Sequence, residues 1–97
     1  MNRNKKQFKK PHKADYVCEN CGFNCTKGGE MFYLHTEIWY RITLKWKGVT
    51  TQKGILCIKC CQDFLGRPLS KGDFNDSYVN KIQNFHKSAR LLNCLSR

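Results

Sequence analysis

The chain has 97 residues, with 18 Lys or Arg against 7 Asp or Glu, so that its formal net charge is +11. A chain of this length forms one small domain, and no stretch approaches the roughly 18 consecutive apolar residues of a membrane span. The positive charge favours a polyanionic partner, with nucleic acid before an acidic protein.

Residues 1–13 predict a flexible basic arm. The segment contains no acid, one aromatic residue and six cations: Arg3, Lys5, Lys6, Lys9, Lys10 and Lys13. Such a segment cannot bury enough apolar surface to offset the entropy that it would lose on ordering. We expect these six residues to contact nucleic acid, and residues 14–97 to form a single folded domain.

A tight turn is expected at residues 18–22, because a glycine ends this stretch and gives the backbone the freedom that the turn needs. Residues 31–34 are a short apolar run and predict a strand. The stretch 36–46 fits two interpretations, since its apolar positions alternate, yet Ile38 and Ile42 lie one helical turn apart. The pattern leans to a helix over 37–42 and a strand afterwards.

A helix is expected to begin at Cys57 and to end at Gly66. Cys57 and Cys60 would then lie on its first turn, where unpaired amides and the helix dipole stabilise thiolates. Residues 70–73 read as a capping box.

The clearest predicted helix is the last, over residues 77–95. Five apolar residues recur there at spacings of three and four and form one stripe: Tyr78, Ile82, Phe85, Ala89 and Leu92. Such a stripe is typical of a helix that packs on a core.

Two Cys-x-x-Cys pairs, separated by 35 residues, form the strongest motif of the chain. The four thiolates that they supply are Cys18, Cys21, Cys57 and Cys60. Four thiolates are the ligand set of a closed, tetrahedral structural zinc site, so we expect one structural Zn²⁺ here. Disulfides among the same residues are the alternative. Cys25 or Cys61 could replace a ligand, whereas Cys94 is expected to be a buried small hydrophobe.

The cysteines also favour a reduced, intracellular protein. Their number is odd, two pairs have metal-site spacing, and no apolar signal region follows the first charges. A secreted disulfide scaffold would instead use paired cysteines. We therefore expect a cytoplasmic protein with no membrane association.

Aromatic and positive residues are mixed between residues 39 and 47. The candidates for nucleic-acid contact are Arg41, Lys45, Trp46 and Lys47. Bases stack on aromatic rings while cations meet the phosphates, as in single-strand binders. Trp39 is expected to fill the core. Trp46 could either fill the core or bind nucleic acid.

The layout of two knuckles, a hairpin between them and a helix resembles the treble clef of the HNH nucleases. That resemblance implies a histidine general base on the hairpin and further ligands for a catalytic cation. His35 lies near the position of the base, and His86 is the other weak catalytic candidate. The residue after the second knuckle, often histidine in that family, is Cys61 here. The departure favours a protein that is not an enzyme.

Just over half of the chain resembles a group of small phage and bacterial zinc-knuckle proteins. The similar blocks are residues 18–22, 32–34, 37–39, 56–60, 65–70 and 73–74. Most distinctive is the leucine-cysteine knuckle that Leu-Gly-Arg-x-Leu and Asp-Phe follow. The resemblance implies a zinc module encoded by a phage or mobile element in a bacterial cytoplasm. It also favours a strand followed by a helix over residues 32–42. Residues 61 and 62 depart from the pattern.

The sequence thus predicts an α+β fold, a small treble-clef-like zinc domain with a β-hairpin, a ligand-bearing helix and a C-terminal helix. The expected function is a zinc-stabilised, non-enzymatic module that binds DNA or RNA. One alternative is an adaptor that binds or inhibits a host bacterial enzyme. A degenerate HNH-type nuclease is the second alternative.

Overall fold

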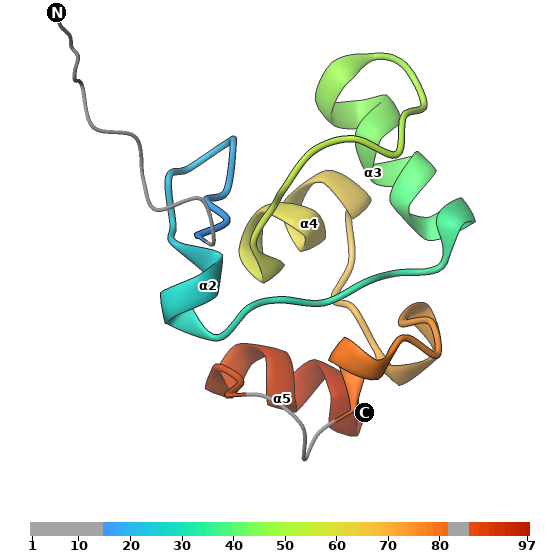
Figure 1. Ribbon diagram of the computed structural model, residues 1–97. Coiled ribbons are helices and arrows are strands. Elements are labelled where there is room, and N and C mark those ends of the chain that lie inside the picture. Colours follow the sequence, from blue (N-terminus) through green and yellow to red (C-terminus); the bar gives the residue numbers. More distant parts are fainter. Residues whose placement is uncertain (1–14, 82–85) are drawn as a thin grey trace, which may run out of the picture.

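The computed structural model describes residues 15–81 and 86–97, so the arm expected at residues 1–13 lies outside the described chain. Helices dominate the described residues (Figure 1). The α-helices are α2 (Cys25–Gly28), α3 (Thr36–Lys47), α4 (Ile58–Leu65) and α5 (Ala89–Ser96), and the 3-10 turns are η1 (Lys71–Asp73) and η2 (Tyr78–Asn80). None of these helices is long and apolar enough to cross a lipid bilayer.

The expected β-hairpin is not seen in the described residues. Extended pairing there is limited to two isolated antiparallel bridges, Val17 with Asn24 and Leu34 with Phe74. The strand expected over residues 31–34 is wrong, because this segment forms only the isolated bridge at Leu34 and hydrogen bonds beside it to residues 73–75. The α+β class is therefore not confirmed, because almost no strand accompanies the helices.

Helix α3 resolves the ambiguous stretch in favour of one continuous helix. The helix expected over residues 37–42 is confirmed, and the strand expected after it is wrong. Continuing the helix buries Ile42 and Thr43 and brings the rings of Trp39 and Trp46 to 6.4 Å between centroids. Gly48 ends the helix with φ 80°, a left-handed conformation that glycine adopts without steric cost.

Helix α4 forms where the sequence predicts it. Cys57 is its N-cap residue, and Gly66 ends it in the left-handed conformation with φ 86°. It packs against α3, and the rings of Trp46 and Phe64 lie 6.3 Å apart across this contact. The capping box expected at residues 70–73 is also present, around η1.

The single helix expected over residues 77–95 is wrong. Among the described residues of this stretch, the structure has only the 3-10 turn η2 and the helix α5. Asn80 turns its amide towards Tyr33 and bonds both backbone groups of that residue, at 2.9 and 2.7 Å. Ser88 then caps a new helix by accepting from the N–H of Leu91.

The apolar face of α5 also differs from the predicted stripe. Leu91, Cys94 and Leu95 are buried, while Ala89 and Leu92 of the predicted stripe are exposed. Tyr78 is 66% exposed, and Ile82 and Phe85 lie outside the described residues. The buried face of α5 is therefore not the one that the predicted stripe indicates.

Candidate metal centre

The first knuckle is a hydrogen-bonded turn. The Cys18 N–H donates to the carbonyl of Phe23 at 2.8 Å, and the Gly22 N–H donates back to the carbonyl of Cys18 at 2.9 Å. Gly22 has φ 84°, which the turn requires. Glu19 exchanges hydrogen bonds with the backbone of Ile55, at 2.8 and 2.9 Å. These two bonds dock the first knuckle on the segment that leads into the second.

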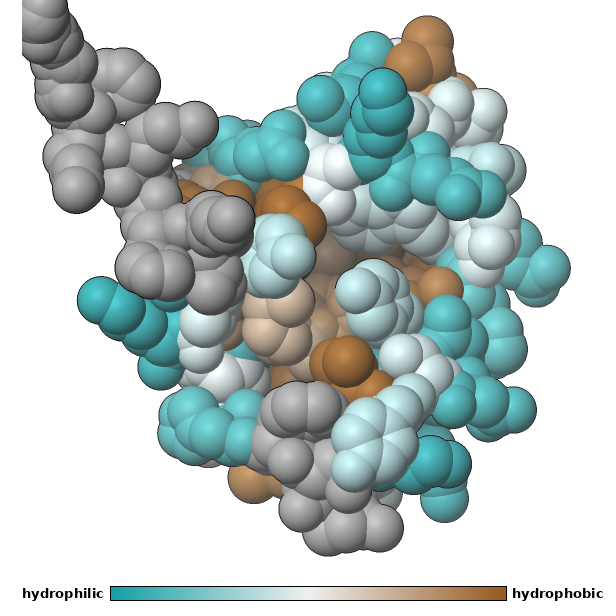
Figure 2. Space-filling model, viewed as in Figure 1, coloured by the Kyte–Doolittle hydropathy of each residue, from teal (hydrophilic) through white to brown (hydrophobic). Residues whose placement is uncertain are grey.

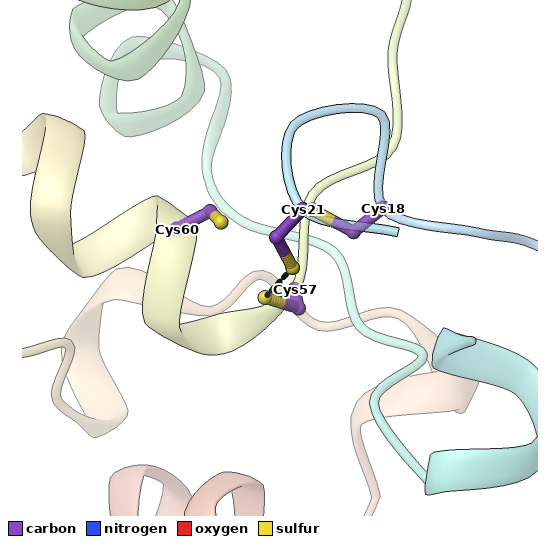
Figure 3. A group of neighbouring side chains, drawn as sticks. All are labelled: Cys18, Cys21, Cys57 and Cys60. Carbon is purple, nitrogen blue, oxygen red and sulfur yellow. Dashed lines mark hydrogen bonds between the residues drawn. The ribbon is translucent and has the colours of Figure 1, made fainter. Parts of the chain in front are cut away.

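The four cysteine sulfurs converge as the sequence predicts. One sulfur each from Cys18, Cys21, Cys57 and Cys60 lies within 4.8 Å of all the others. Figure 3 shows two of them on the first knuckle, Cys57 at the start of α4 and Cys60 on its first turn. The cluster joins segments that are 36 residues apart at the Cys21–Cys57 contact.

The spacing of the sulfurs suits a tetrahedral metal. Four ligands at the usual Zn–S distance of about 2.3 Å have neighbouring sulfurs about 3.8 Å apart. The sulfurs of Cys21 and Cys57 are 3.7 Å apart, far beyond a disulfide bond, and all seven cysteines are free. The four residues could therefore hold a metal ion. Three of them are buried and Cys21 is exposed, so an ion would lie near the surface.

Polar groups around the cluster favour negative charge on the Cys18 sulfur. Burial alone would raise the pKa of the Cys18 thiol, but backbone hydrogen bonds from Cys57, Cys21 and Asn20 outweigh it and bring the pKa to about 7. The Asn20 amide also donates to the Cys60 sulfur at 3.3 Å. Burial raises the pKa of the Cys57 and Cys60 thiols, so a metal must displace protons from these two.

A buried acid fixes the start of α4 beside the cluster. The Glu30 side chain is completely buried and accepts from the Ile58 N–H at 2.9 Å. It also accepts from the Ser88 hydroxyl at 2.9 Å and from Arg90 at 2.8 and 3.1 Å. The pKa of Arg90 lies above its ordinary value, first because of Glu30 and to a smaller degree because of Cys57. Outer contacts of this kind orient metal ligands.

Sequence reasoning missed Glu30 and Arg90. No local pattern relates two residues that are 60 positions apart in the chain. The only local signal was that Glu30 precedes the apolar run of residues 31–34, and acids in that position are common in ordinary surface loops.

The other three cysteines lie outside the cluster. Among the described residues the group of close sulfurs does not include Cys25 or Cys61, which are fully buried. Burial raises the pKa of Cys25 to about 12 and raises that of Cys61 well above its ordinary value. Cys94 is 2% exposed, as expected of a small hydrophobe. Burial raises the pKa of the Cys94 thiol as well, so the neutral form is favoured at all three cysteines.

The two histidines considered as catalytic candidates lie on different parts of the fold. His35 is exposed at the start of α3, where its carbonyl accepts from the Trp39 N–H and its N–H donates to Asp73. His86 is exposed beside Gly29. Within the described chain, neither belongs to a group of three potential metal ligands.

The candidate nucleic-acid residues of the folded part lie on α3. Arg41 and Lys45 are exposed there. The Lys47 ammonium lies 4.4 Å from the ring centre of Trp46 and 3.9 Å from the Glu19 carboxylate. Trp46 itself is half-buried, because its ring packs against the rings of Trp39 and Phe64. The other candidates, Arg3, Lys5, Lys6, Lys9, Lys10 and Lys13, lie outside the described residues.

Comparison with known protein families, curated proteins and solved structures finds no match to this chain. Its function is therefore inferred from the cysteine cluster and from the charge and shape of the surface. Thiolate donors in a tetrahedral set suit Zn²⁺ better than they suit hard cations such as Mg²⁺.

Proposed function

We propose that this protein is a zinc-stabilised module that binds nucleic acid and has no enzymatic activity of its own. The observation that carries the metal assignment is the convergence of the four cysteine sulfurs within 4.8 Å. One Zn²⁺ on Cys18, Cys21, Cys57 and Cys60 would join a knuckle to a helix N-terminus, in a treble-clef-like arrangement without the usual hairpin. A metal bound by four thiolates has no open coordination position for an activated water, so its role is structural.

The size of the protein makes such a metal important for its stability. Structural Zn²⁺ contributes roughly 10–16 kcal/mol of binding free energy in zinc-finger peptides, against about 5–15 kcal/mol for the whole stability of an ordinary domain. The described residues form only a small core. Metal binding and folding are therefore expected to be one process.

Nucleic acid is the favoured partner because cations outnumber acids by 18 to 7 in the chain. Four of the seven acids, Glu19, Glu30, Asp63 and Asp73, already form ion pairs within the domain. Arg41, Lys45 and Lys53 are exposed and have no ion pair with any described residue. With the six cations of residues 1–13, these positions offer a charge that matches a phosphate backbone.

Binding of a labelled oligonucleotide across a salt series tests this proposal. Each phosphate neutralised releases counterions, so the logarithm of affinity should fall linearly with the logarithm of salt concentration. Removal of residues 1–13 should make the slope shallower. Equal retention on DNA and on an uncharged matrix at low salt would overturn the proposal. A partner captured from bacterial lysate after nuclease treatment would favour the adaptor alternative.

A further inference from the structure

One cysteine differs from the other six in its access to solvent. Cys21, on the first knuckle, is exposed, whereas every other cysteine of the chain is buried. Cys25 and Cys61, outside the cluster, are 0% exposed. Oxidation of a cysteine depends on the exposure and thiolate character of its sulfur, so a dissolved oxidant meets Cys21 first.

The apolar recess of the domain gives no second route to the sulfurs. This recess of about 340 Å³ lies between residues 30–34 and 52–56. Figure 2 shows apolar residues gathered in a hollow near the middle of the face in view. No cysteine lines the recess in the part of the chain that the structure describes. An oxidant that enters the recess therefore touches no thiol, which leaves Cys21 as the point of attack.

Hydrogen bonds from N–H groups distinguish two buried ligands from Cys21. The sulfur of Cys18 accepts backbone hydrogen bonds from Cys57 and Asn20. The Asn20 amide donates to the sulfur of Cys60 at 3.3 Å. By contrast, the hydrogen-bond contact of the Cys21 sulfur with the described residues is with another sulfur, that of Cys57. A hydrogen bond from N–H withdraws negative charge from a thiolate and lowers its nucleophilicity, so Cys21 keeps a more reactive sulfur.

A second thiol lies beside Cys21. The sulfurs of Cys21 and Cys57 are 3.7 Å apart and face each other in Figure 3. A disulfide bond is about 2.05 Å long, so a combined movement of about 1.7 Å by the two side chains closes it. Cys57 is 1% exposed, so an oxidant reaches it through Cys21 and not directly. An exposed thiol next to a buried second one is the usual arrangement of a redox-sensing pair.

We propose that Cys21 is a site of oxidation by peroxides, and that its oxidised sulfur forms a disulfide with Cys57 and so releases the metal. This assignment rests on the metal site of the proposed function and adds redox regulation to it.

The reaction with hydrogen peroxide takes two steps. The Cys21 sulfur attacks one peroxide oxygen, the O–O bond breaks, and a sulfenic acid forms while water leaves. The Cys57 sulfur then attacks the Cys21 sulfur, the S–O bond breaks, and a second water leaves as the disulfide forms. Two sulfurs are oxidised and one peroxide is reduced. Where the sulfurs enter as thiolates, the solvent supplies the protons of the two waters.

The disulfide would remove two of the four ligands at once. Cys18 and Cys60 remain, and two thiolates cannot complete a tetrahedral set. Because metal binding and folding are expected to be one process, the oxidised chain should lose both its metal and its helical structure. Oxidation would thereby switch off the folded module.

The test adds hydrogen peroxide to the full zinc-loaded chain and follows released Zn²⁺ with a chromogenic chelator. The remaining thiols are alkylated, and mass spectrometry of a digest locates the disulfide. Trypsin cleaves after Lys59, between the cysteines of the second pair, and a glutamate-specific protease cleaves after Glu19, between those of the first. Two thiols should be lost for each Zn²⁺ released, and the first disulfide should join Cys21 to Cys57. Dithiothreitol with Zn²⁺ should reverse both changes.

Two histidine variants separate the reactive thiol from the metal site. Histidine also binds Zn²⁺, so Cys21→His and Cys60→His each keep four potential ligands. Cys21→His should lose the release of Zn²⁺ at a peroxide dose that empties the wild-type protein. Cys60→His keeps Cys21 beside Cys57 and should release Zn²⁺ as the wild type does. Zinc content and far-UV circular dichroism before oxidation show whether each variant folds, and the disulfide map of the wild-type chain decides independently of both.

Three results would overturn the proposed oxidation site. The first is a wild-type protein that keeps its Zn²⁺ and all seven thiols at a dose that oxidises a free cysteine peptide. The second is a first disulfide other than Cys21–Cys57, and the third is equally fast release of Zn²⁺ from Cys21→His and wild type. Each would leave the proposed metal site and nucleic-acid binding intact. A wild-type chain that binds no Zn²⁺ before oxidation would instead reject the proposed metal site itself.

Discussion

The carboxylate of Glu30 and the guanidinium of Arg90 meet at 2.8 Å, although 60 residues separate them in the chain. The acid is completely buried and also accepts from the first helical N–H of α4. The pair therefore ties α5 to the helix that carries Cys57 and Cys60. The contacts of Glu30 thus link the C-terminal helix to the position of two candidate metal ligands.

Arg90→Ala should destabilise the domain by about 2–4 kcal/mol. Removing one partner of a buried pair typically costs about 3–5 kcal/mol, and Arg90 is 43% exposed, which lowers the value. Urea unfolding of the zinc-loaded protein measures the change. Arg41→Ala removes an exposed arginine that forms no ion pair with residues 15–81 or 86–97, and should cost less than about 0.5 kcal/mol. Equal losses for the two variants would contradict a structural role for the pair.

Removal of the metal should unfold the domain. A strong chelator should abolish the helical circular dichroism signal, and added Zn²⁺ should restore it with one ion per chain. Cys60→Ser removes a ligand and should prevent folding at ordinary zinc concentrations. Cys94→Ser changes a buried cysteine outside the cluster, so that variant should fold less stably yet bind one Zn²⁺. Mass spectrometry under native conditions counts the ion, and a folded, metal-free Cys60→Ser protein would contradict the assignment.

Asp73 should stabilise the domain down to moderately acidic pH. The Arg67 guanidinium, at 2.8 Å, holds the pKa of the Asp73 carboxyl below its usual value. Because the pKa of this carboxyl is lower in the folded protein, its stabilisation is fully present above the unfolded-state pKa of about 4. The stabilisation is lost as the pH falls through the lower, folded-state pKa.

The cost of Asp73→Asn should therefore be the same at pH 7 and pH 5. The carboxylate also caps η1 by accepting from the Ser70 N–H, so we expect a cost of about 1–2 kcal/mol. Chemical unfolding at saturating zinc measures this cost at both pH values. A cost that halves between pH 7 and pH 5 would show that the carboxyl titrates higher than the structure implies.

The double variant Arg41→Ala/Lys45→Ala should weaken binding to all oligonucleotides alike. Each phosphate contact on a single strand contributes about 0.7 to the salt slope, so two lost contacts should reduce it by about 1.4. Anisotropy titrations at several salt concentrations give the slope. Lys59→Ala removes a cation that already pairs with Asp63 at 2.9 Å and serves as the control. An unchanged slope in the double variant would place the phosphate contacts elsewhere.

The features that the sequence predicted correctly depend on residues close together in the chain. Cys57 and Gly66 mark the two ends of α4, and residues 70–73 form the capping box. The four candidate metal ligands could also be recognised, because the x-x spacing in each pair is itself a local constraint. Caps, turns and short ligand spacings are local interactions that few distant contacts override.

The features that it predicted wrongly depend on distant contacts. Residues 43–47 alternate as a strand would, yet packing of Trp46 on Trp39 and Phe64 keeps them helical. The stripe over residues 77–95 is periodic, yet the Asn80 amide bonds Tyr33, 47 residues away, and the helix begins only after Ser88. Periodicity alone could not show these contacts.

Sequence alone therefore determined which residues could bind a metal and where the ligand-bearing helix begins and ends. Tertiary structure decided what surrounds them: the Glu30–Arg90 pair beside the ligands, and the recess between residues 30–34 and 52–56. The physical reason is that knuckles and caps form their hydrogen bonds between residues only a few positions apart in the chain. Buried charges and recesses, by contrast, exist only where segments far apart in the chain come together.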